Sequence, residues 1–157
     1  MKIRKAINSD AVNISALGIC TWIDTYATTG VFDKISRYIH TEFTETKILE
    51  IIKSKTVYVC FEEDHLFGYM VLGPEDKNKI EIETLYVLPG FKRKGIGRML
   101  LDHAAGSQSK TYWLSVWELN HNAIGFYINN GFKETGETHF DLYGDKIRNI
   151  ILSRGRC

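Results

Sequence analysis

The spacing of the hydrophobic residues predicts helices in the first third of the chain and mostly strands after it. A short strand is expected over residues 3–7, and the side-chain oxygens of residues 8–10 are suited to cap a following helix. That helix is predicted from four apolar residues at helical spacing: Val12, Ala16, Ile19 and Ile23. A second helix is predicted from about Thr44. Between the two, the aromatic and polar stretch 22–38 lacks a clear period and is interpreted as loop and short helix.

From Thr56 onward the pattern becomes that of β-strands. Runs rich in β-branched and aromatic residues, separated by turn residues, predict six strands: 56–61, 66–72, 80–88, 111–117, 132–140 and 146–152. Two helices interrupt them, one from about Ile96 and one that Asn120 caps and that ends at Gly131. The predicted order is β-α-α-β-β-β-α-β-α-β-β, a mixed sheet with helices packed on it.

Composition narrows the class of protein. The chain has 157 residues, 44% hydrophobic and 25% charged, which is typical of one soluble globular domain. It contains no apolar stretch of membrane-spanning length, and its start lacks the apolar core of a signal peptide. The three scattered cysteines argue against a disulfide framework: Cys20, Cys60 and Cys157. We expect a single cytoplasmic domain over residues 1–157, without a membrane partner.

Charge is balanced overall but uneven along the chain. The net charge of +1 argues against a protein whose overall field attracts nucleic acid. Residues 92–98, here called the basic segment, nevertheless hold four cations and no acid: Lys92, Arg93, Lys94 and Arg98. The basic segment indicates a local anion site, and a solvated loop is the alternative interpretation. The five histidines show no metal-ligand spacing, so no metal is expected: His40, His65, His103, His121 and His139.

Gly95-Ile96-Gly97 lies in the basic segment, between a predicted strand and a predicted helix. Amides at a helix start attract phosphate, and glycine lets the phosphate approach the backbone. A dinucleotide fingerprint would need glycine where Leu100 stands, and a P-loop begun at Gly90 would need lysine where Ile96 stands. Neither nucleotide motif is complete, and a plain turn with a helix start stays open.

The segment PGFKRKGIGRMLL, Pro89 to Leu101, resembles the acyl-CoA-binding motif of the GNAT superfamily of N-acetyltransferases, whose core is Gln/Arg-x-x-Gly-x-Gly/Ala. Lys92 stands at the Gln/Arg position and keeps the charge without the forked guanidinium. The segment WLSVWELNHNAIGFYINNGF, Trp113 to Phe132, is similar to the later motif of the same family. Together with the ending TGETHF, it is similar to bacterial polyamine acetyltransferases of the PaiA type.

This resemblance implies an α/β fold with a mixed, mostly antiparallel central sheet of about seven strands flanked by about four helices. It implies acetyl-CoA as the co-substrate and a primary amine that attacks the thioester directly in a ternary complex. Contacts with acetyl-CoA are implied for two segments and one helix cap: Leu85, Tyr86, Val87, Lys92, Arg93, Lys94, Gly95, Ile96, Gly97, Arg98 and Asn120.

Catalytic roles are implied for Glu83, as a general base often acting through water, and for Tyr127, as the acid that protonates the coenzyme A thiolate. Glu83 shares a strand face with Glu81, and that face turns apolar beyond Glu83, where burial would raise a carboxyl pKa. A solvent-facing pair of acids, a core tyrosine and a mere helix cap are the alternatives for Glu83, Tyr127 and Asn120. The acceptor pocket is implied to include Trp22, Asp24 and Tyr26.

Other functions stay open on the sequence. A CoA-binding module without catalysis would keep the glycine motif, and a nucleic-acid-binding domain would use the basic segment but need a wider basic face. A polyamine acceptor is favoured by the PaiA-like ending and by four acids: Asp24, Asp33, Glu42 and Glu83. An amino acid, a peptide N-terminus and an antibiotic stay open as acceptors, because specificity is expected in residues 22–42. A homodimer is also left open.

Overall fold

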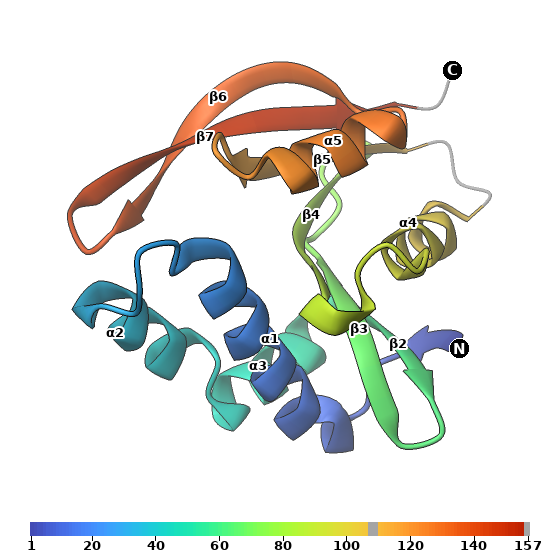
Figure 1. The fold of residues 1–157 in the computed structure, drawn as a ribbon. Helices are drawn as coiled ribbons and strands as arrows, with labels where there is room; N and C mark the ends of the chain where they lie inside the picture. Colours follow the sequence, from blue (N-terminus) through green and yellow to red (C-terminus); the bar gives the residue numbers. More distant parts are fainter. Residues whose placement is uncertain (107–109, 156–157) are drawn as a thin grey trace. The chain divides into compact units, whose positions relative to one another are not determined.

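The computed structural model describes residues 1–106 and 110–155, whose elements follow the predicted order with one additional helix (Figure 1). Seven strands are present in these described residues, in the sheet order β1-β2-β3-β4-β5-β7-β6. β4 and β5 pair in parallel, whereas β1 with β2, β2 with β3, and β7 with both β5 and β6 pair antiparallel. The predicted mixed, mostly antiparallel sheet is therefore confirmed. Cys157 lies outside the described residues.

The residues divide into two compact units, each discontinuous in the sequence. Unit 1 comprises residues 1–72 and 84–106, and unit 2 comprises residues 73–83 together with the described part of 107–157. Strand β4 (Lys79–Val87) contributes to both, because the boundary falls after Glu83. A single domain over the whole chain stays a prediction.

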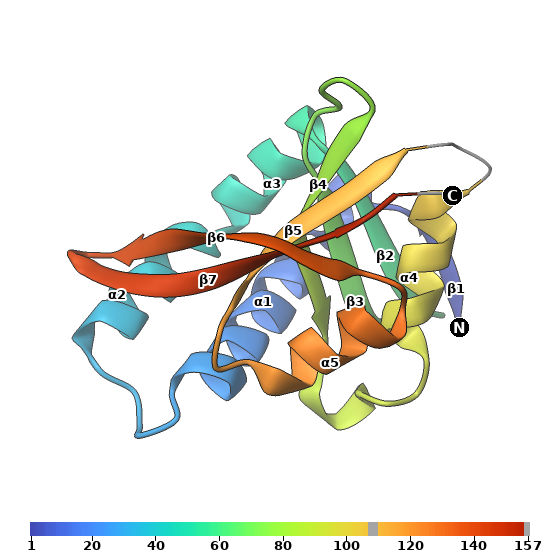
Figure 2. The ribbon, with the colours of Figure 1, turned by 90° about the horizontal axis from the view of Figure 1, so that it is seen from above.

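Unit 1 contains three complete strands and four α-helices. The strands are β1 (Lys2–Lys5), β2 (Thr56–Glu62) and β3 (His65–Leu72). The helices are α1 (Ala11–Tyr26), α2 (Asp33–Glu42), α3 (Glu45–Ser54) and α4 (Ile96–Ala105), and short 3₁₀ turns cover Asn8–Asp10 and Pro89–Phe91. Figure 2 shows α1 and α3 on one side of β2 and β3, and α4 on the other. Both faces of these strands are thus covered, which explains their nearly continuous apolar sequences.

Helix α1 forms as predicted but buries a different face. The predicted face is exposed or only half-buried: Val12, Ala16, Ile19 and Ile23. The buried residues lie on another stripe: Ala11, Ile14, Leu17, Gly18, Thr21 and Trp22. The chain carries two stripes at helical spacing, and the buried one includes small residues such as Gly18 and Thr21, which bring the helix close to its neighbours. Both stripes carry equally many large apolar residues, so hydrophobic spacing alone does not show which one is buried, and the stripe predicted from it is not the buried one.

The stretch 22–38 is more helical than its sequence pattern indicates. Helix α1 continues to Tyr26, and α2 begins at Asp33, whose carboxylate lies in the first turn where the helix dipole favours an acid. Ile35 and Ile39, one turn apart, form the buried side of α2. This short helix has few apolar positions, so its period is hard to recognise in an aromatic and polar sequence. It is the helix that raises the number of α-helices in the described residues to five.

Unit 2 contains the beginning of β4, the strands β5 (Thr111–Trp117), β6 (Lys133–Leu142) and β7 (Asp145–Arg154), and helix α5 (His121–Asn129). β6 and β7 form a hairpin whose turn has positive φ at Tyr143 and Gly144, as hairpin turns matching the strand twist require. Asp141 Oδ1 accepts the Gly144 N–H at 3.1 Å and supports that turn. These elements match the predicted ones closely.

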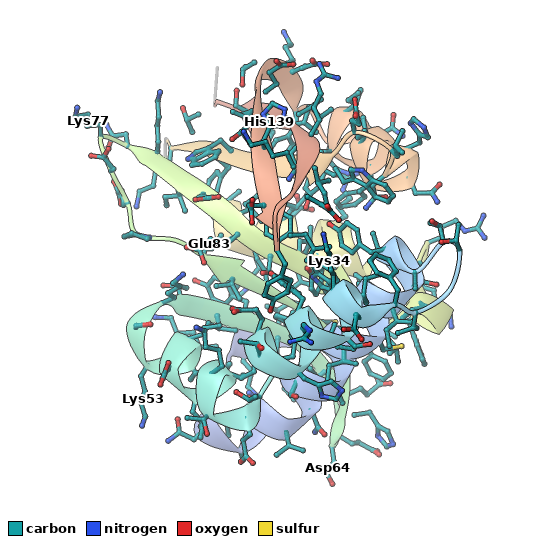
Figure 3. All side chains as sticks on the ribbon, turned by 90° about the vertical axis from the view of Figure 1, so that its left-hand side faces the viewer. Lys34, Lys53, Asp64, Lys77, Glu83 and His139 are labelled. Atoms are coloured by element: carbon teal, nitrogen blue, oxygen red, sulfur yellow. The ribbon has the colours of Figure 1, made fainter. Side chains whose placement is uncertain are left out.

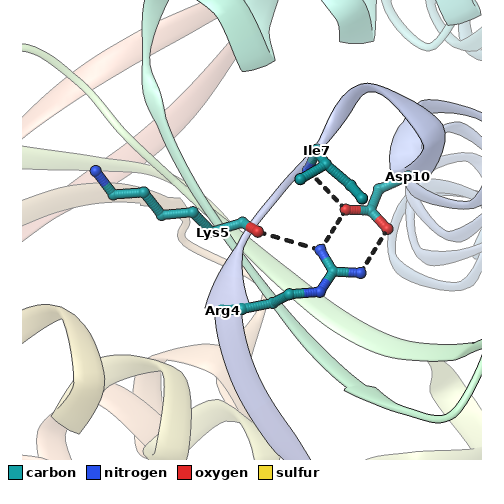
Figure 4. A network of polar contacts seen from close by, with 4 residues as sticks. All are labelled: Arg4, Lys5, Ile7 and Asp10. Carbon is teal, nitrogen blue, oxygen red and sulfur yellow. Dashed lines mark hydrogen bonds and ion pairs between the residues drawn. The ribbon is translucent and has the colours of Figure 1, made fainter.

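The predicted cap at residues 8–10 is used differently from expectation. Asp10 precedes α1 but accepts no bond from the helix amides through its side chain. Its carboxylate instead accepts the Ile7 N–H at 2.8 Å and both terminal nitrogens of Arg4, at 2.6 and 3.0 Å (Figure 4). Arg4 also donates to the Lys5 carbonyl at 3.1 Å. The forked pair therefore joins β1 to the start of α1.

We expect Asp10→Asn to lower the free energy of unfolding by about 1–3 kcal/mol at pH 7, because Arg4 loses its anion. Burial raises the pKa of Asp10, but the hydrogen bonds from Arg4 and the Ile7 amide and the charge of Arg4 outweigh burial, so this pKa lies below its ordinary value. A lowered folded pKa contributes stability above the unfolded pKa of about 4, and this contribution is lost as the pH falls through the folded pKa.

Chemical denaturation between pH 7 and pH 3 measures the difference. The difference in the free energy of unfolding between the parent chain and Asp10→Asn should become smaller as the pH falls. As a control, Asp64→Asn in the exposed β2–β3 turn should leave the free energy of unfolding unchanged. A gap that stays constant with pH would show that the carboxylate charge is not the source.

Candidate functional site

The N-terminus of α4 presents backbone amides within the basic segment. Gly95 is the residue before the helix, with φ +80° in the left-handed region, and it has no side chain that could accept from the first amides. The first bond closing a helical turn runs from Met99 N–H to the Gly95 carbonyl at 2.9 Å. The N–H groups of Ile96, Gly97 and Arg98 come before Met99 in the helix, where the α-helical pattern offers them no acceptor. They lie at the positive end of the helix dipole. This arrangement suits an anion such as phosphate.

The loop before α4 is attached firmly to unit 1. The Leu88 N–H donates to the Phe67 carbonyl of β3 at 2.9 Å, and the Phe67 and Phe91 rings pack with centroids 4.7 Å apart. Lys94 Nζ lies 4.4 Å from the centre of the Phe91 ring, so the ring holds one cation of the basic segment. Arg93 adopts a positive φ of 61°, which is uncommon for a residue with a side chain.

Two of the predicted sets of site residues meet at Lys92. Its ammonium forms an exposed ion pair with Asp24 on α1, which links the basic segment to the segment expected near the acceptor. At the other end of the basic segment, Arg98 Nε lies 3.5 Å from Asp102 one turn later in α4. Two of the four cations therefore already have a carboxylate partner within unit 1.

Six aromatic residues of unit 1 form a continuous group, here called the aromatic cluster: Trp22, Tyr26, Tyr38, Phe43, Tyr69 and Tyr86. Trp22 is at its centre and is only 4% exposed. The Trp22 ring stacks on Tyr38 with centroids 4.0 Å apart and lies 4.2 Å from Tyr26. Phe43 contacts Tyr38 and Tyr86, and Tyr86 in turn meets Tyr69 edge-on at 5.6 Å. Most of the Trp22 surface is thus used in packing.

Three phenols of the aromatic cluster, those of Tyr26, Tyr69 and Tyr86, stay protonated. Burial raises the pKa of Tyr26 to about 12 and raises those of Tyr69 and Tyr86 well above the ordinary value. The phenols of Tyr69, Tyr26 and Tyr38 raise the pKa of Tyr86 further, whereas a hydrogen bond from the Trp22 indole lowers it. The cluster therefore offers neutral hydroxyls and ring faces to any ligand that reaches it.

The structure brings Trp22, Tyr26 and Tyr86 together, although the sequence assigned the first two to the acceptor and the third to the cofactor. Tyr38, Phe43 and Tyr69 belong with them and were not identified from the sequence. Their spacing gives no common period, because they come from α2, the α2–α3 connection and β3. Aromatic enrichment of residues 22–43 was the one available signal.

Glu83 lies on β4 at the end of the unit 2 segment (Figure 3). It is exposed, so the expected burial of its carboxyl is not found, while Glu81 on the same face is half-buried. β4 pairs with β5 over Lys79–Glu81 and Thr111–Trp113, and the predicted cofactor residues Leu85–Val87 lie beyond these pairs, half-buried, in unit 1.

The other two predicted residues of unit 2 lie on α5. Asn120 caps this helix by accepting the Ala123 N–H at 3.2 Å through its side-chain oxygen, which leaves its NH₂ group as a donor. Tyr127 is 7% exposed and meets the rings of Phe126 and Phe132 at 5.1 and 5.3 Å. Burial raises the pKa of the Tyr127 phenol well above its ordinary value, so it is protonated at neutral pH.

Metal and membrane sites have no geometric counterpart in the part of the chain that the structure describes. Among residues 1–106 and 110–155, no three His, Cys, Asp or Glu side chains are placed to hold a metal ion. No helix in the same residues is both long and apolar enough to cross a membrane. Cys20 and Cys60 are free thiols, the first exposed and the second buried.

Comparison with known families agrees with this geometry. The family model for the acetyltransferase (GNAT) domain matches residues 53–134, which is just over half of the chain. The chain belongs to the GNAT acetyltransferase family. The match runs from the end of α3 into β6 and so includes the basic segment, Glu83, Asn120 and Tyr127.

Individual GNAT relatives cover nearly the whole chain. An uncharacterized N-acetyltransferase from the pepI 3′ region of Lactobacillus delbrueckii subsp. lactis is 25% identical over 98% of this chain and 96% of its own length. Spermidine N(1)-acetyltransferase of Thermoplasma acidophilum is 29% identical over 85% of this chain and 88% of that protein. The crystal structure of PaiA N-acetyltransferase from Thermoplasma acidophilum in complex with coenzyme A has a TM-score of 0.84 and 25% identity, covering 99% of this chain and 98% of that one.

We expect Gly18→Ala to destabilise the protein by about 1–3 kcal/mol, because the added methyl group overpacks the aromatic cluster. A Cβ at this position of α1 would lie 2.4 Å from ring carbons of Phe43 and 2.9 Å from the Tyr69 hydroxyl. Thermal unfolding, with near-ultraviolet circular dichroism of the cluster, measures the effect. Gly125→Ala in α5 is the matched control: nothing lies within 4 Å of its Cβ, and alanine favours a helix by up to about 1 kcal/mol. Equal stabilisation by both changes would contradict the packing described for Gly18.

Proposed function

We propose that this chain transfers the acetyl group of acetyl-CoA to a primary amine and that the acceptor is a polyamine or a related small cationic amine. The observation that carries the proposal is the glycine-started helix α4 within the basic segment, in a chain of the GNAT family. The similarity to spermidine N(1)-acetyltransferase and to the PaiA complex with coenzyme A supports the acceptor class and the co-substrate.

The residues of unit 1 fit the phosphates of acetyl-CoA. The amides of Ile96, Gly97 and Arg98 would hold the pyrophosphate, and Gly95 keeps side-chain atoms out of its path. The cations Lys92 and Arg93 and their neighbours add attraction that depends on ionic strength. The backbone of Leu85–Val87 would pair with the pantetheine arm, as the family resemblance implies. When bound, acetyl-CoA supplies an acetyl group activated as a thioester.

In the reaction, the amine nitrogen forms a bond to the carbonyl carbon and the carbon–sulfur bond breaks. The amine must first lose a proton, because an alkylamine with a pKa of about 10.4 is mostly protonated at about pH 7. Removing this proton costs roughly 4 kcal/mol. Glu83 would accept that proton, directly or through water. The Val87 amide would stabilise the oxyanion, and Tyr127 would give a proton to the sulfur.

The choice of a cationic acceptor rests on the relatives more than on the acids that the sequence suggested. Asp24 pairs with Lys92, Asp33 lies 3.4 Å from Arg37, and Glu42 lies 3.8 Å from Lys47. Surface pairs of this kind are weak, at about 0–1 kcal/mol, so a polyamine ammonium would compete with the resident cation for these carboxylates. We therefore expect a preference for polycations that decreases with salt.

A panel of amines with acetyl-CoA tests the proposal, with thiol release and product mass as readouts. Spermidine and spermine should be acetylated with a KM that rises with ionic strength. Turnover with amino acids or neutral arylamines alone would overturn the polyamine assignment and leave the transferase. Binding of coenzyme A without turnover of any amine, including a peptide N-terminus or an antibiotic, would contradict the transferase itself.

We expect coenzyme A to raise the melting temperature, and the rise to shrink with added salt. A ligand at about a hundred times its Kd stabilises the folded state by about 2.7 kcal/mol. Gly97→Val should weaken this effect, because the branched side chain stands where phosphate must approach the second residue of α4. Met99→Val is the matched control, since the same residue type enters the same helix on its exposed side. Undiminished binding by Gly97→Val would show that the loop is only a turn.

Tyr127→Phe should lower kcat by roughly a hundredfold, the usual contribution of a positioned acid, while the affinity for acetyl-CoA changes little. The phenylalanine ring keeps the contacts with Phe126 and Phe132. In the parent enzyme the raised pKa keeps the phenol of Tyr127 protonated. Titration of Tyr127 should therefore cause no decline of the parent kcat between about pH 6 and about pH 9, a range below phenol titration. If Tyr127→Phe has the same kcat as the parent enzyme throughout that pH range, the acid is water or another group.

A further inference from the structure

Gly73 connects β3 to the loop before β4. The backbone conformation at position 73 does not require a glycine. Its φ lies outside the left-handed region, unlike that of Gly95 or Gly131, so any L-residue could adopt the conformation. Its N–H donates to the Glu81 carbonyl of β4 at 2.9 Å, and this bond does not depend on the side chain. The absence of a side chain at position 73 therefore needs another explanation.

The space beside Gly73 is filled by the carboxylate of Glu83. A Cβ on Gly73 would lie 2.9 Å from Glu83 Oε1 and 3.6 Å from its carboxyl carbon. The same Cβ would be 3.5 Å from Glu81 Cβ, which is an ordinary van der Waals contact. The Glu83 side chain thus points toward Gly73. Gly73 bonds to the backbone of Glu81, and Glu83 is two residues further along β4, so this is a diagonal contact.

We infer that Gly73 is a positioning residue for the Glu83 carboxylate: its missing side chain provides the place in which the proposed base rests. The inference rests on the proposed function, because it concerns the group that would take the proton from the amine. The nearest atom to an added Cβ belongs to the far end of a flexible side chain and not to the backbone. A methyl group at position 73 would therefore move the carboxylate and leave the strands where they are.

The consequence is a loss of rate without a loss of fold. Gly73→Ala should lower kcat by roughly tenfold, because a displacement of about 1 Å in a catalytic group costs up to a hundredfold. The KM for acetyl-CoA and the melting temperature should hardly change. Gly136→Ala is the matched control, since it is also a strand-region glycine of unit 2 without positive φ, and its Cβ would meet only Ile151 Cδ1 at 3.8 Å. This control should keep the parent kcat.

A double-mutant cycle separates positioning from a general structural effect. Glu83→Gln removes the base but keeps the shape of the side chain, so adding Gly73→Ala to it should lower kcat by no more than about twofold. If Gly73→Ala costs the same factor in both backgrounds, it acts elsewhere and the inference is overturned, while the transferase assignment stands. If Glu83→Gln alone leaves kcat unchanged at every pH, Glu83 is not the base, and the inference falls for that separate reason.

The shorter acid provides a rescue. In Glu83→Asp the carboxylate withdraws from Gly73, so Gly73→Ala should cost less in this background than in the parent chain. The same pair covers a Gly73→Ala protein that fails to fold, because the combined variant should then recover the parent melting temperature. A combined variant that stays unfolded, or a Gly73→Ala enzyme with the parent kcat, would contradict the inference.

Discussion

The register of β4 is the constraint on which the rest of the site depends. Successive side chains of a strand point to opposite faces, so Glu81, Glu83, Leu85 and Val87 share one face of this strand. A slip of one residue would turn all of them to the other side. In unit 2 the register is set by the parallel pairs of Lys79–Glu81 with β5. In unit 1, the Leu88 N–H bond to β3 fixes the other end of the strand.

Close approach of the backbones adds to this control in unit 1. Gly68 on β3 is so near to β4 that a Cβ would lie 2.8 Å from the Tyr86 carbonyl oxygen, a contact that only a backbone shift could relieve. The side chain of Tyr86 meanwhile packs in the aromatic cluster. The strand segment that the family resemblance assigns to the cofactor arm is thus held by a glycine through its backbone and by aromatic packing through its side chain. The two glycines differ: Gly68 admits backbone, whereas Gly73 admits a carboxylate.

Local signals in the sequence predicted most elements and the two motifs, because their causes are local. The Asn120 cap, the left-handed Gly131 and the strand alternation of β5 involve neighbours in sequence. The buried face of α1, the short helix α2 and the aromatic cluster could not be predicted, since each depends on packing between distant segments. The same holds for Gly73, whose role requires knowing where the Glu83 side chain lies.

Charge at the basic segment also changes meaning once partners are known. Four cations in seven residues suggest a strongly positive loop, yet Lys92 and Arg98 each face a carboxylate, and Lys94 lies over a ring. The carboxylate partners cancel much of the positive field of the basic segment at a distance. Water and salt screen the rest of that field. The amides at the start of α4 act at short range, on an anion that they contact directly, because the helix fixes their direction. If the proposed function holds, the backbone amides would supply most of the phosphate recognition here, and a bound phosphate would compete with Asp24 for Lys92 and with Asp102 for Arg98.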